Sequence, residues 1–204
     1  MKLLPMSPDL AVNIVWLVWY IPWIAAVVWS AKTKTQMGTD IQGAHRPLSG
    51  LGVMLLFFVP ATVGGKLFGS TLLGFFATKL WHEPAWAAWS LVALTVAAFG
   101  FCWWARLHLG RLWSGFVTLK EGHRVIDTGP YALVRHPIYS GVIFAALTTA
   151  LVRASPAGLL GFVLLAVGFS MTARIEERFL REQLGAEVYD AYSRRVGMLV
   201  PMVR

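Results

Sequence analysis

The sequence predicts an all-α integral membrane protein with about five transmembrane helices and a polar C-terminal region that faces the cytoplasm. Of the 204 residues, 57% are hydrophobic and only 14% are charged, and the mean hydropathy is +0.61. An ordinary soluble enzyme has about a quarter of its residues charged, so that class is excluded. Several charge-free runs approach the roughly 20 apolar residues that a helix needs to cross a ~30 Å hydrocarbon core.

The first half of the chain holds three of these runs. Residues 10–31 form the first, which is too long and too rich in aromatic residues for a cleaved signal peptide. Residues 48–64 form a shorter second run, and residues 86–105 form a clear third one. Between them, residues 67–80 are marginal for a crossing. This piece extends the second helix, lies in the interface or dips into the membrane and returns, so a sixth span stays open.

The second half holds two further runs, residues 138–152 and 154–173. Pro156 follows Arg153 so closely that we expect the two helices to form a tight hairpin. Arg153 is expected to snorkel outward at the far membrane interface. The chain is predicted to be a single membrane domain, residues 1–204, with N-terminal helices in residues 1–105. Residues 106–204, including the hairpin 138–173, carry most of the charge and the compact polar motifs.

The distribution of Lys and Arg predicts the orientation. The formal net charge is +8. Five spans place 14 Lys and Arg residues on the side of residues 32–46, 106–135 and 174–204, and four on the other side. With a sixth span the split becomes 13 to 5. The positive-inside rule therefore puts the polar segments in the cytoplasm, and with five spans the amino terminus outside. The charge thus reflects topology, and no nucleic-acid partner is expected.

The cysteine and histidine residues argue against a disulfide and against a metal site. Cys102 is the single cysteine and allows no internal disulfide, and its apolar setting predicts an inert packing residue. The five His residues are dispersed without ligand spacing, so no metal site is expected.

The densest polar motif is GPYALVRHPIYSG, residues 129–141. Its proline residues restrict the chain before Tyr131 and Ile138, and its glycine residues permit tight turns. The segment thereby delivers Arg135, His136 and Tyr139 to the mouth of a membrane helix. Taken singly, Arg135 is a topological anchor and Tyr139 an interfacial tyrosine. Together with a His directly before a proline, they indicate a functional cluster.

A second motif, RIEERFLRE, follows the last apolar run. Glu177 and Arg181 are four residues apart, and we expect them to pair on a solvated helix face. Glu176 lies only three residues after the run ends, where an ionised carboxylate is costly without a partner. Arg174, His136 or a cationic ligand would supply that partner, so Glu176 is predicted to bind a ligand.

These two motifs, the hairpin between them, the following QLGAEVYDAY and Pro201 resemble the isoprenylcysteine carboxyl methyltransferase family and the related phospholipid methyltransferase-like membrane enzymes. The upstream segments LGRLWSGFV and GHRVIDTG fit the same pattern, so the resemblance covers residues 106–201. It implies an S-adenosylmethionine-dependent methyltransferase with its cofactor at the cytoplasmic C-terminal half. The resemblance further implies a lipid-like acceptor that enters from the bilayer, with a carboxylate of isoprenylcysteine type.

The resemblance also implies the site residues, carried over by motif position. The cofactor contacts would be Thr118, His123, Arg124, Val125, Ile126, Tyr131, His136, Pro137, Ile138, Tyr139 and Glu176. Of these, His136, Tyr139 and Glu176 would be catalytic. The family places an arginine four residues before the equivalent of Glu176, where this chain has Thr172; the nearest arginine, Arg174, is the predicted substrate-binding residue.

Other functions stay open at this point. The acceptor is alternatively a phospholipid amine or a small molecule methylated on nitrogen or sulfur, and an ammonium acceptor would first need a base. A second enzyme class is an NADPH-dependent membrane reductase of the sterol type. A non-catalytic scaffold or transport subunit is the third possibility. The oligomeric state is not predicted.

Overall fold

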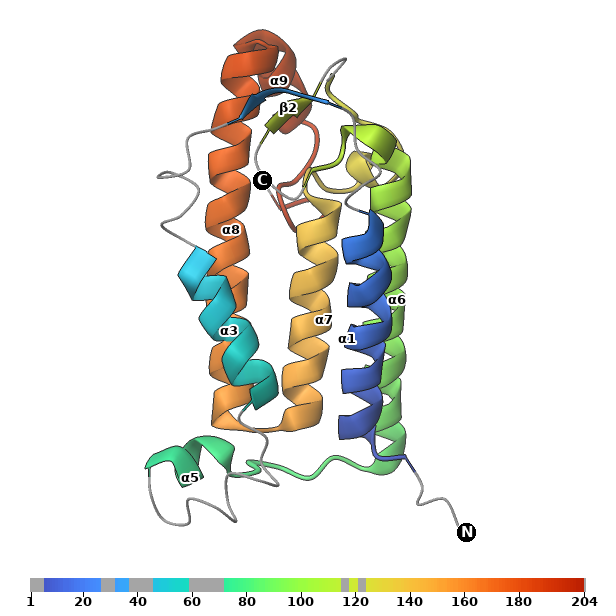
Figure 1. The fold of residues 1–204 in the computed structure, drawn as a ribbon, viewed down its shortest axis with the longest axis vertical. Coiled ribbons are helices and arrows are strands. Elements are labelled where there is room, and N and C mark those ends of the chain that lie inside the picture. Colours follow the sequence, from blue (N-terminus) through green and yellow to red (C-terminus); the bar gives the residue numbers. More distant parts are fainter. Residues whose placement is uncertain are drawn as a thin grey trace.

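The computed structural model describes residues 6–26, 32–36, 46–58, 72–114, 118–120 and 124–203. Long helices run side by side and form a bundle (Figure 1). The helices are α1 (Pro8–Ala25), α3 (Arg46–Phe58), α5 (Leu72–Ala77), α6 (Ala85–Leu109), α7 (Pro137–Arg153), α8 (Pro156–Leu184) and α9 (Ala186–Ser193). The 3-10 segments are η2 (Gly110–Leu112) and η3 (Gly129–Ala132), and the strands are β1 (Thr33–Gln36) and β2 (Thr118–Lys120).

The two ends of the bundle differ. Strands β1 and β2 pair antiparallel at the end where α7 begins, together with η3, α9 and residues 194–203 (Figure 1). We call this the polar end. The opposite end, which we call the far end, carries the α7–α8 turn and α5 (Figure 1).

Within the described ranges, three helices are long and apolar enough to cross a membrane: α1, α6 together with η2, and α8. Two shorter apolar helices, Pro47–Phe58 and Pro137–Arg153, pack beside them. Large apolar side chains cover the outer faces; Phe58 and Ile21, for example, are 77% and 66% exposed. A surface of this kind requires lipid, and the chain is a multi-pass integral membrane protein.

The described part of residues 67–80 forms only the short helix α5. The amide of Leu80, just after this helix, donates a hydrogen bond to the carbonyl of Ala154 in the α7–α8 turn, at 2.6 Å. The chain is therefore at the far end both in α5 and at Leu80. A six-residue helix rises only about 9 Å, so α5 is no further crossing.

The predicted hairpin is confirmed. Helix α7 ends at Arg153, Ala154 takes a left-handed conformation with φ of 51°, and α8 begins at Pro156. The Ser155 hydroxyl caps α8 by accepting a hydrogen bond from the amide of Gly158 at 3.1 Å. A left-handed residue followed by a serine cap and a proline is a sequence that stops one helix and starts the next.

The prediction that Arg153 snorkels outward is wrong. Its side chain is only 6% exposed and donates hydrogen bonds to Asp9 Oδ1 at 3.3 Å and to Asn13 Oδ1 at 2.5 Å. Helix α1 thus brings two polar acceptors to the guanidinium, which makes the buried position more favourable than exposure. The contact fastens α1 to the hairpin at the far end.

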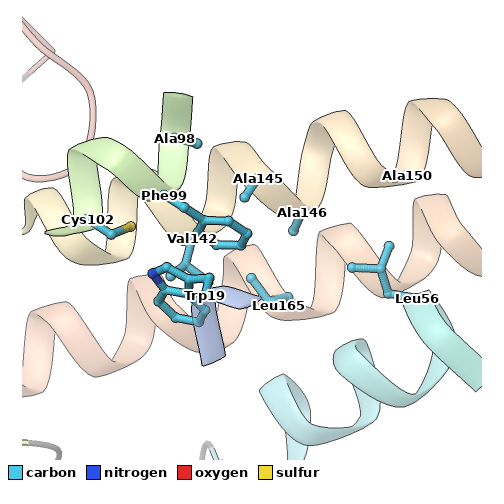
Figure 2. Packing of buried hydrophobic residues seen from close by; sticks show 10 residues of the cluster. All are labelled: Trp19, Leu56, Ala98, Phe99, Cys102, Val142, Ala145, Ala146, Ala150 and Leu165. Atoms are coloured by element: carbon cyan, nitrogen blue, oxygen red, sulfur yellow. The ribbon is translucent and has the colours of Figure 1, made fainter. Parts of the chain in front are cut away.

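Small residues let the helices approach closely. A Cβ atom on Gly141 of α7 would collide with the Cys102 sulfur and lie 3.0 Å from the Ala98 carbonyl of α6. Gly52 of α3 and Gly161 of α8 face each other in the same way, each ideal Cβ only 2.7 Å from the other residue's carbonyl oxygen. In lipid, helices associate without a hydrophobic driving force, and such close contacts supply the van der Waals packing that holds them together. The core beside them contains the buried Cys102, as predicted, together with Trp19 and other apolar side chains (Figure 2).

A buried arginine closes the bundle next to the polar end. Arg106, near the end of α6, donates hydrogen bonds to the carbonyls of Ala26 at 2.8 Å and Gly110 at 2.7 Å. Its guanidinium also stacks on the ring of Trp113, 4.4 Å from the centroid. The last turns of α1 and α6 are therefore fixed to each other where the cavity described below begins.

Candidate functional site

The described residues enclose a cavity of about 270 Å³ between the apolar bundle and the polar end. Its volume lies near the lower limit of small-molecule sites, about 300 Å³. The lining comes from α1, the residues after α6, residues 124–126, η3 and the start of α7, α8 and α9. The lining residues are Trp19, Trp23, Leu109, Leu112, Trp113, Ser114, Arg124, Val125, Ile126, Tyr131, Arg135, His136, Pro137, Ile138, Tyr139, Val142, Phe169, Glu176, Leu180, Leu184, Tyr189 and Tyr192.

The start of α7 presents two parallel rings to this cavity. His136 is the N-cap residue of α7 and Pro137 is its first helical residue, where the missing amide costs nothing. The rings of His136 and Tyr139 stack with centroids 5.4 Å apart and an interplanar angle of 5°. Tyr139 also contacts the ring of Phe169 on α8, at 5.1 Å. The stack fixes the orientation of both polar side chains.

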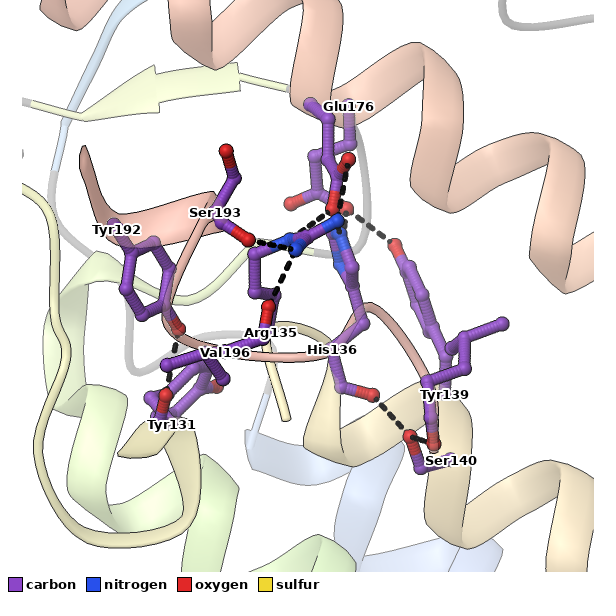
Figure 3. A network of polar contacts seen from close by, with 11 residues as sticks. Tyr131, Arg135, His136, Tyr139, Ser140, Glu176, Tyr192, Ser193 and Val196 are labelled. Atoms are coloured by element: carbon purple, nitrogen blue, oxygen red, sulfur yellow. Dashed lines mark hydrogen bonds and ion pairs between the residues drawn. The ribbon is translucent and has the colours of Figure 1, made fainter. Parts of the chain in front are cut away.

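Glu176 of α8 completes this group. Its Oε2 accepts a hydrogen bond from the Tyr139 hydroxyl at 2.8 Å and lies 3.7 Å from His136 Nδ1 (Figure 3). Of the partners proposed from sequence, His136 contacts Glu176, and Tyr139, which was not proposed as a partner, donates the hydrogen bond. Arg174 is exposed on α8 and does not line the cavity.

Glu177 has a larger role than the sequence suggested. It accepts two hydrogen bonds from Arg135, at 2.6 Å and 3.1 Å, and its Oε1 lies 3.1 Å from His136 Nε2. Arg135 donates two more hydrogen bonds, to the carbonyls of Ser193 and Val196. The expected pairing of Glu177 with Arg181 is wrong, because Arg181 binds Asp190 of α9 instead. We call the Arg135–Glu177 pair the clasp.

The clasp also sets the role of Arg135. The sequence placed this guanidinium in a functional cluster, but four of its five N–H groups point to acceptors within the protein. Arg135 therefore joins the start of α7 to α8 and to the residues after α9.

Residues 194–203, which we call the C-terminal segment, cover the start of α7. The amides of Arg135 and His136 donate to the carbonyls of Gly197 and Met198, at 2.8 Å and 3.1 Å. The Tyr192 hydroxyl donates to the Tyr131 carbonyl at 2.7 Å (Figure 3). Burial raises the pKa values of the Tyr131 and Tyr192 hydroxyls well above the ordinary value of a tyrosine, so both hydroxyls stay protonated.

Most of the residues predicted from motif position meet at the cavity. Nine line it: Arg124, Val125, Ile126, Tyr131, His136, Pro137, Ile138, Tyr139 and Glu176. Thr118 lies in β2, but its side chain is outside what the structure describes, and so is the whole of His123. Within the described ranges, no group of three His, Cys, Asp or Glu side chains is arranged to hold a metal ion.

Sequence reasoning missed the aromatic wall of the cavity. Trp19 and Trp23 come from α1, four residues apart, and Trp23 packs edge-on against Trp113 at 5.5 Å. The four-residue spacing was a signal that both rings share one helix face. The sequence showed these residues only as part of an aromatic-rich apolar run, because nothing local says which face of a membrane helix meets a cavity.

Comparison with known proteins gives a consistent result. The model of the isoprenylcysteine carboxyl methyltransferase (ICMT) family matches residues 91–182. The chain is 34% identical over 136 residues to a methanethiol S-methyltransferase of Pseudomonas sp., which covers 61% of this chain and 51% of the relative. It is 38% identical over 88 residues to a protein-S-isoprenylcysteine O-methyltransferase of Saccharomyces cerevisiae, covering 42% of this chain and 36% of the relative.

A third relative is protein-S-isoprenylcysteine O-methyltransferase B of Arabidopsis thaliana, 30% identical over 98 residues, which are 46% of this chain and 49% of the relative. The chain thus spans about half or less of the length of these curated relatives. The matched segment contains α7, the hairpin turn and the carboxylate pair of α8. Residues 91–182, which hold most of the cavity's polar group, are therefore similar to the ICMT family of methyltransferases.

Proposed function

We propose that the chain is an S-adenosylmethionine-dependent methyltransferase that methylates the carboxylate of a lipid-like acceptor of isoprenylcysteine type. One observation carries the proposal: a single cavity joins a polar group, His136, Tyr139 and Glu176, to an aromatic wall that faces the apolar bundle. A charged cofactor and an apolar acceptor need both kinds of surface in contact.

The donor set of the cavity fits the cofactor. Glu176 offers a carboxylate to the amine or hydroxyl groups, and Arg124, exposed at the rim, offers a guanidinium to the carboxylate. The faces of Tyr139, Phe169 and Trp23 suit a sulfonium, with about 0.5–2 kcal/mol from each well-placed ring. The bound cofactor would supply a methyl group on a positively charged sulfur, open to in-line displacement by a nucleophile.

Such an acceptor needs little acid–base catalysis from the protein. A carboxylate is already a nucleophile, so the rate depends on alignment and on exclusion of water. The stack of His136 on Tyr139 and the hydrogen bond from Tyr139 to Glu176 provide a rigid surface for alignment. The C-terminal segment and the clasp hold that surface in place.

The membrane arrangement follows from the same account. We infer five crossings, with α3 and α7 completing the set formed by α1, α6 and α8. Helix α7 has 17 residues and rises about 25 Å, so it spans a bilayer that thins locally or reaches the headgroups. The excess of Lys and Arg favours a cytoplasmic polar end, and the cofactor would enter from there.

A second candidate is S-methylation of a small thiol. It is favoured by the Pseudomonas relative, whose match covers 61% of this chain. The chemistry differs at one point: a thiol must first lose its proton, and Glu176 or His136 would then act as the base.

Calorimetry with the purified protein tests the cofactor assignment. We expect the wild type to bind S-adenosylmethionine and not NADPH, and His136→Ala and Glu176→Ala to bind it at least about tenfold more weakly. Arg174→Ala, changed on the exposed face of the same helix, should bind like wild type. Binding of NADPH alone, or of neither compound, would contradict the proposal.

A further inference from the structure

The indole nitrogen of Trp19 is a buried donor without an acceptor among the described residues. Trp19 is 8% exposed and lines the cavity. Leaving a buried N–H group unpaired costs about 1–3 kcal/mol, so such groups are rare and call for an explanation.

The same helix shows that the bundle can satisfy an indole. One turn earlier on α1, Trp16 donates its N–H to the Thr149 hydroxyl of α7 at 2.9 Å. Trp16 is absent from the cavity lining. The unpaired donor therefore belongs to the indole ring that lines the cavity.

Stacking fixes the direction of the Trp19 donor. Its ring lies parallel to Phe99, with centroids 4.5 Å apart, and stacks on Trp23 at 4.8 Å. Trp16 contacts it edge-on at 6.0 Å. Figure 2 shows the nitrogen on the side of the ring toward Cys102, and α7 begins toward that side. A clamped ring offers its N–H at no further entropic cost.

The donor lies on the bilayer side of the polar group. Trp19 belongs to the same apolar cluster as Val142 and Phe169. Val142 lies about 4.5 Å further along α7 than Tyr139, and Phe169 lies about 10 Å before Glu176 along α8. The charged parts of the cofactor belong with Glu176 and Arg124. A polar atom that reaches Trp19 therefore belongs to the apolar partner of the reaction.

We propose that the Trp19 N–H donates a hydrogen bond to a carboxylate oxygen of the methyl acceptor, which makes Trp19 a specificity-determining residue; this rests on the proposed function. One carboxylate oxygen would bond to the methyl carbon as the bond from that carbon to the sulfonium sulfur breaks, with the neutral thioether as leaving group. The other carboxylate oxygen would accept the indole N–H. A sulfur is a weak hydrogen-bond acceptor, so the same donor discriminates against thiols. Acceptor choice would then depend on α1, which lies outside the family match at residues 91–182.

Trp19→Phe tests the inference, because it keeps an aromatic ring in the stack and removes the donor. A second variant carries benzothienylalanine at position 19, which has the size of tryptophan and a sulfur in place of the N–H. Trp16→Phe is the matched control, since it removes an indole N–H outside the cavity. Each protein is assayed for S-adenosylmethionine affinity and for methylation of N-acetyl-S-farnesylcysteine and of methanethiol.

We expect both position-19 variants to bind S-adenosylmethionine like wild type and to lose about 10- to 100-fold in kcat/KM for the carboxylate acceptor. Turnover of the thiol and all values of Trp16→Phe should change less than about threefold. A benzothienylalanine variant with wild-type kcat/KM for the carboxylate would overturn the inference and leave the proposed function intact. Weaker cofactor binding in both variants would also overturn it. No cofactor binding or methyl transfer by the wild type would instead reject the proposed function, and the inference with it.

Discussion

Glu177→Gln is expected to loosen the whole polar end. The change keeps the size of the side chain but removes its charge and replaces one acceptor oxygen by a donor. Glu177 holds three contacts, two with Arg135 and one with His136, within 3.1 Å. Both members of the clasp are largely buried, with side chains 10% and 18% exposed.

The geometry sets the size of the effect. Glutamine keeps one acceptor oxygen for Arg135. Its NH2 group, which is a donor, takes the place of the other oxygen and faces either the second N–H of Arg135 or His136, so that contact is lost. A hydrogen bond to a charged group contributes about 1.5–3 kcal/mol, and a buried pair that loses one partner costs about 3–5 kcal/mol. With one or two of the three contacts retained, we expect a loss of about 2–4 kcal/mol. For a chain of this length that corresponds to a fall of roughly 4–16 °C in Tm.

Thermal unfolding in detergent, followed by circular dichroism, measures the loss. The matched control is Asp190→Asn, which breaks the same two-pronged contact in the Arg181–Asp190 pair, whose side chains are 52% and 34% exposed. Solvent screens an exposed pair, so its Tm should stay close to that of wild type. Equal shifts for the two variants would refute the reasoning that burial makes the clasp strong.

Three further changes test the packing around the site. Gly141→Ala should push α6 and α7 apart and lower stability by about 1–3 kcal/mol, whereas Gly100→Ala, with open space at its Cβ, should be neutral or stabilising; equal Tm values would contradict this. Arg153→Ala should cost about 1–2 kcal/mol because α1 loses its polar attachment to the hairpin, and an unchanged Tm would show that the contact is dispensable. Tyr192→Phe leaves the buried Tyr131 carbonyl without its donor and should cost about 1–2 kcal/mol, with faster proteolysis of the C-terminal segment; wild-type resistance would argue against this anchor.

The sequence was most informative where local chemistry decides. Charge-free runs located α1, α6 and α8, and the short distance from Arg153 to Pro156 located the hairpin turn. The motif around His136 placed the start of α7 at the mouth of the bundle, where the structure has it. These features depend on solvent, capping and proline geometry, all of which can be read from neighbouring residues.

Tertiary partners account for the errors. Helix spacing paired Glu177 with Arg181, but Arg135, 42 residues away, is the better partner because it is buried beside it. Arg153 was expected to reach solvent, since nothing near it in sequence reveals Asp9. The unpaired nitrogen of Trp19 is likewise visible only once the cavity exists. The motifs thus show where in the chain the site lies. Its geometry depends on pairing between a few polar groups that are far apart in sequence.

Transfer of a labelled methyl group tests the central claim most directly. The wild-type protein is incubated with methyl-labelled S-adenosylmethionine and N-acetyl-S-farnesylcysteine, and the labelled ester is counted. We predict ester formation by the wild type and at least about a tenfold lower kcat/KM in His136→Ala and Glu176→Ala. Absence of labelled ester from the wild type, or equal rates in wild type and both variants, would contradict the assignment of this cavity as the methyl-transfer site.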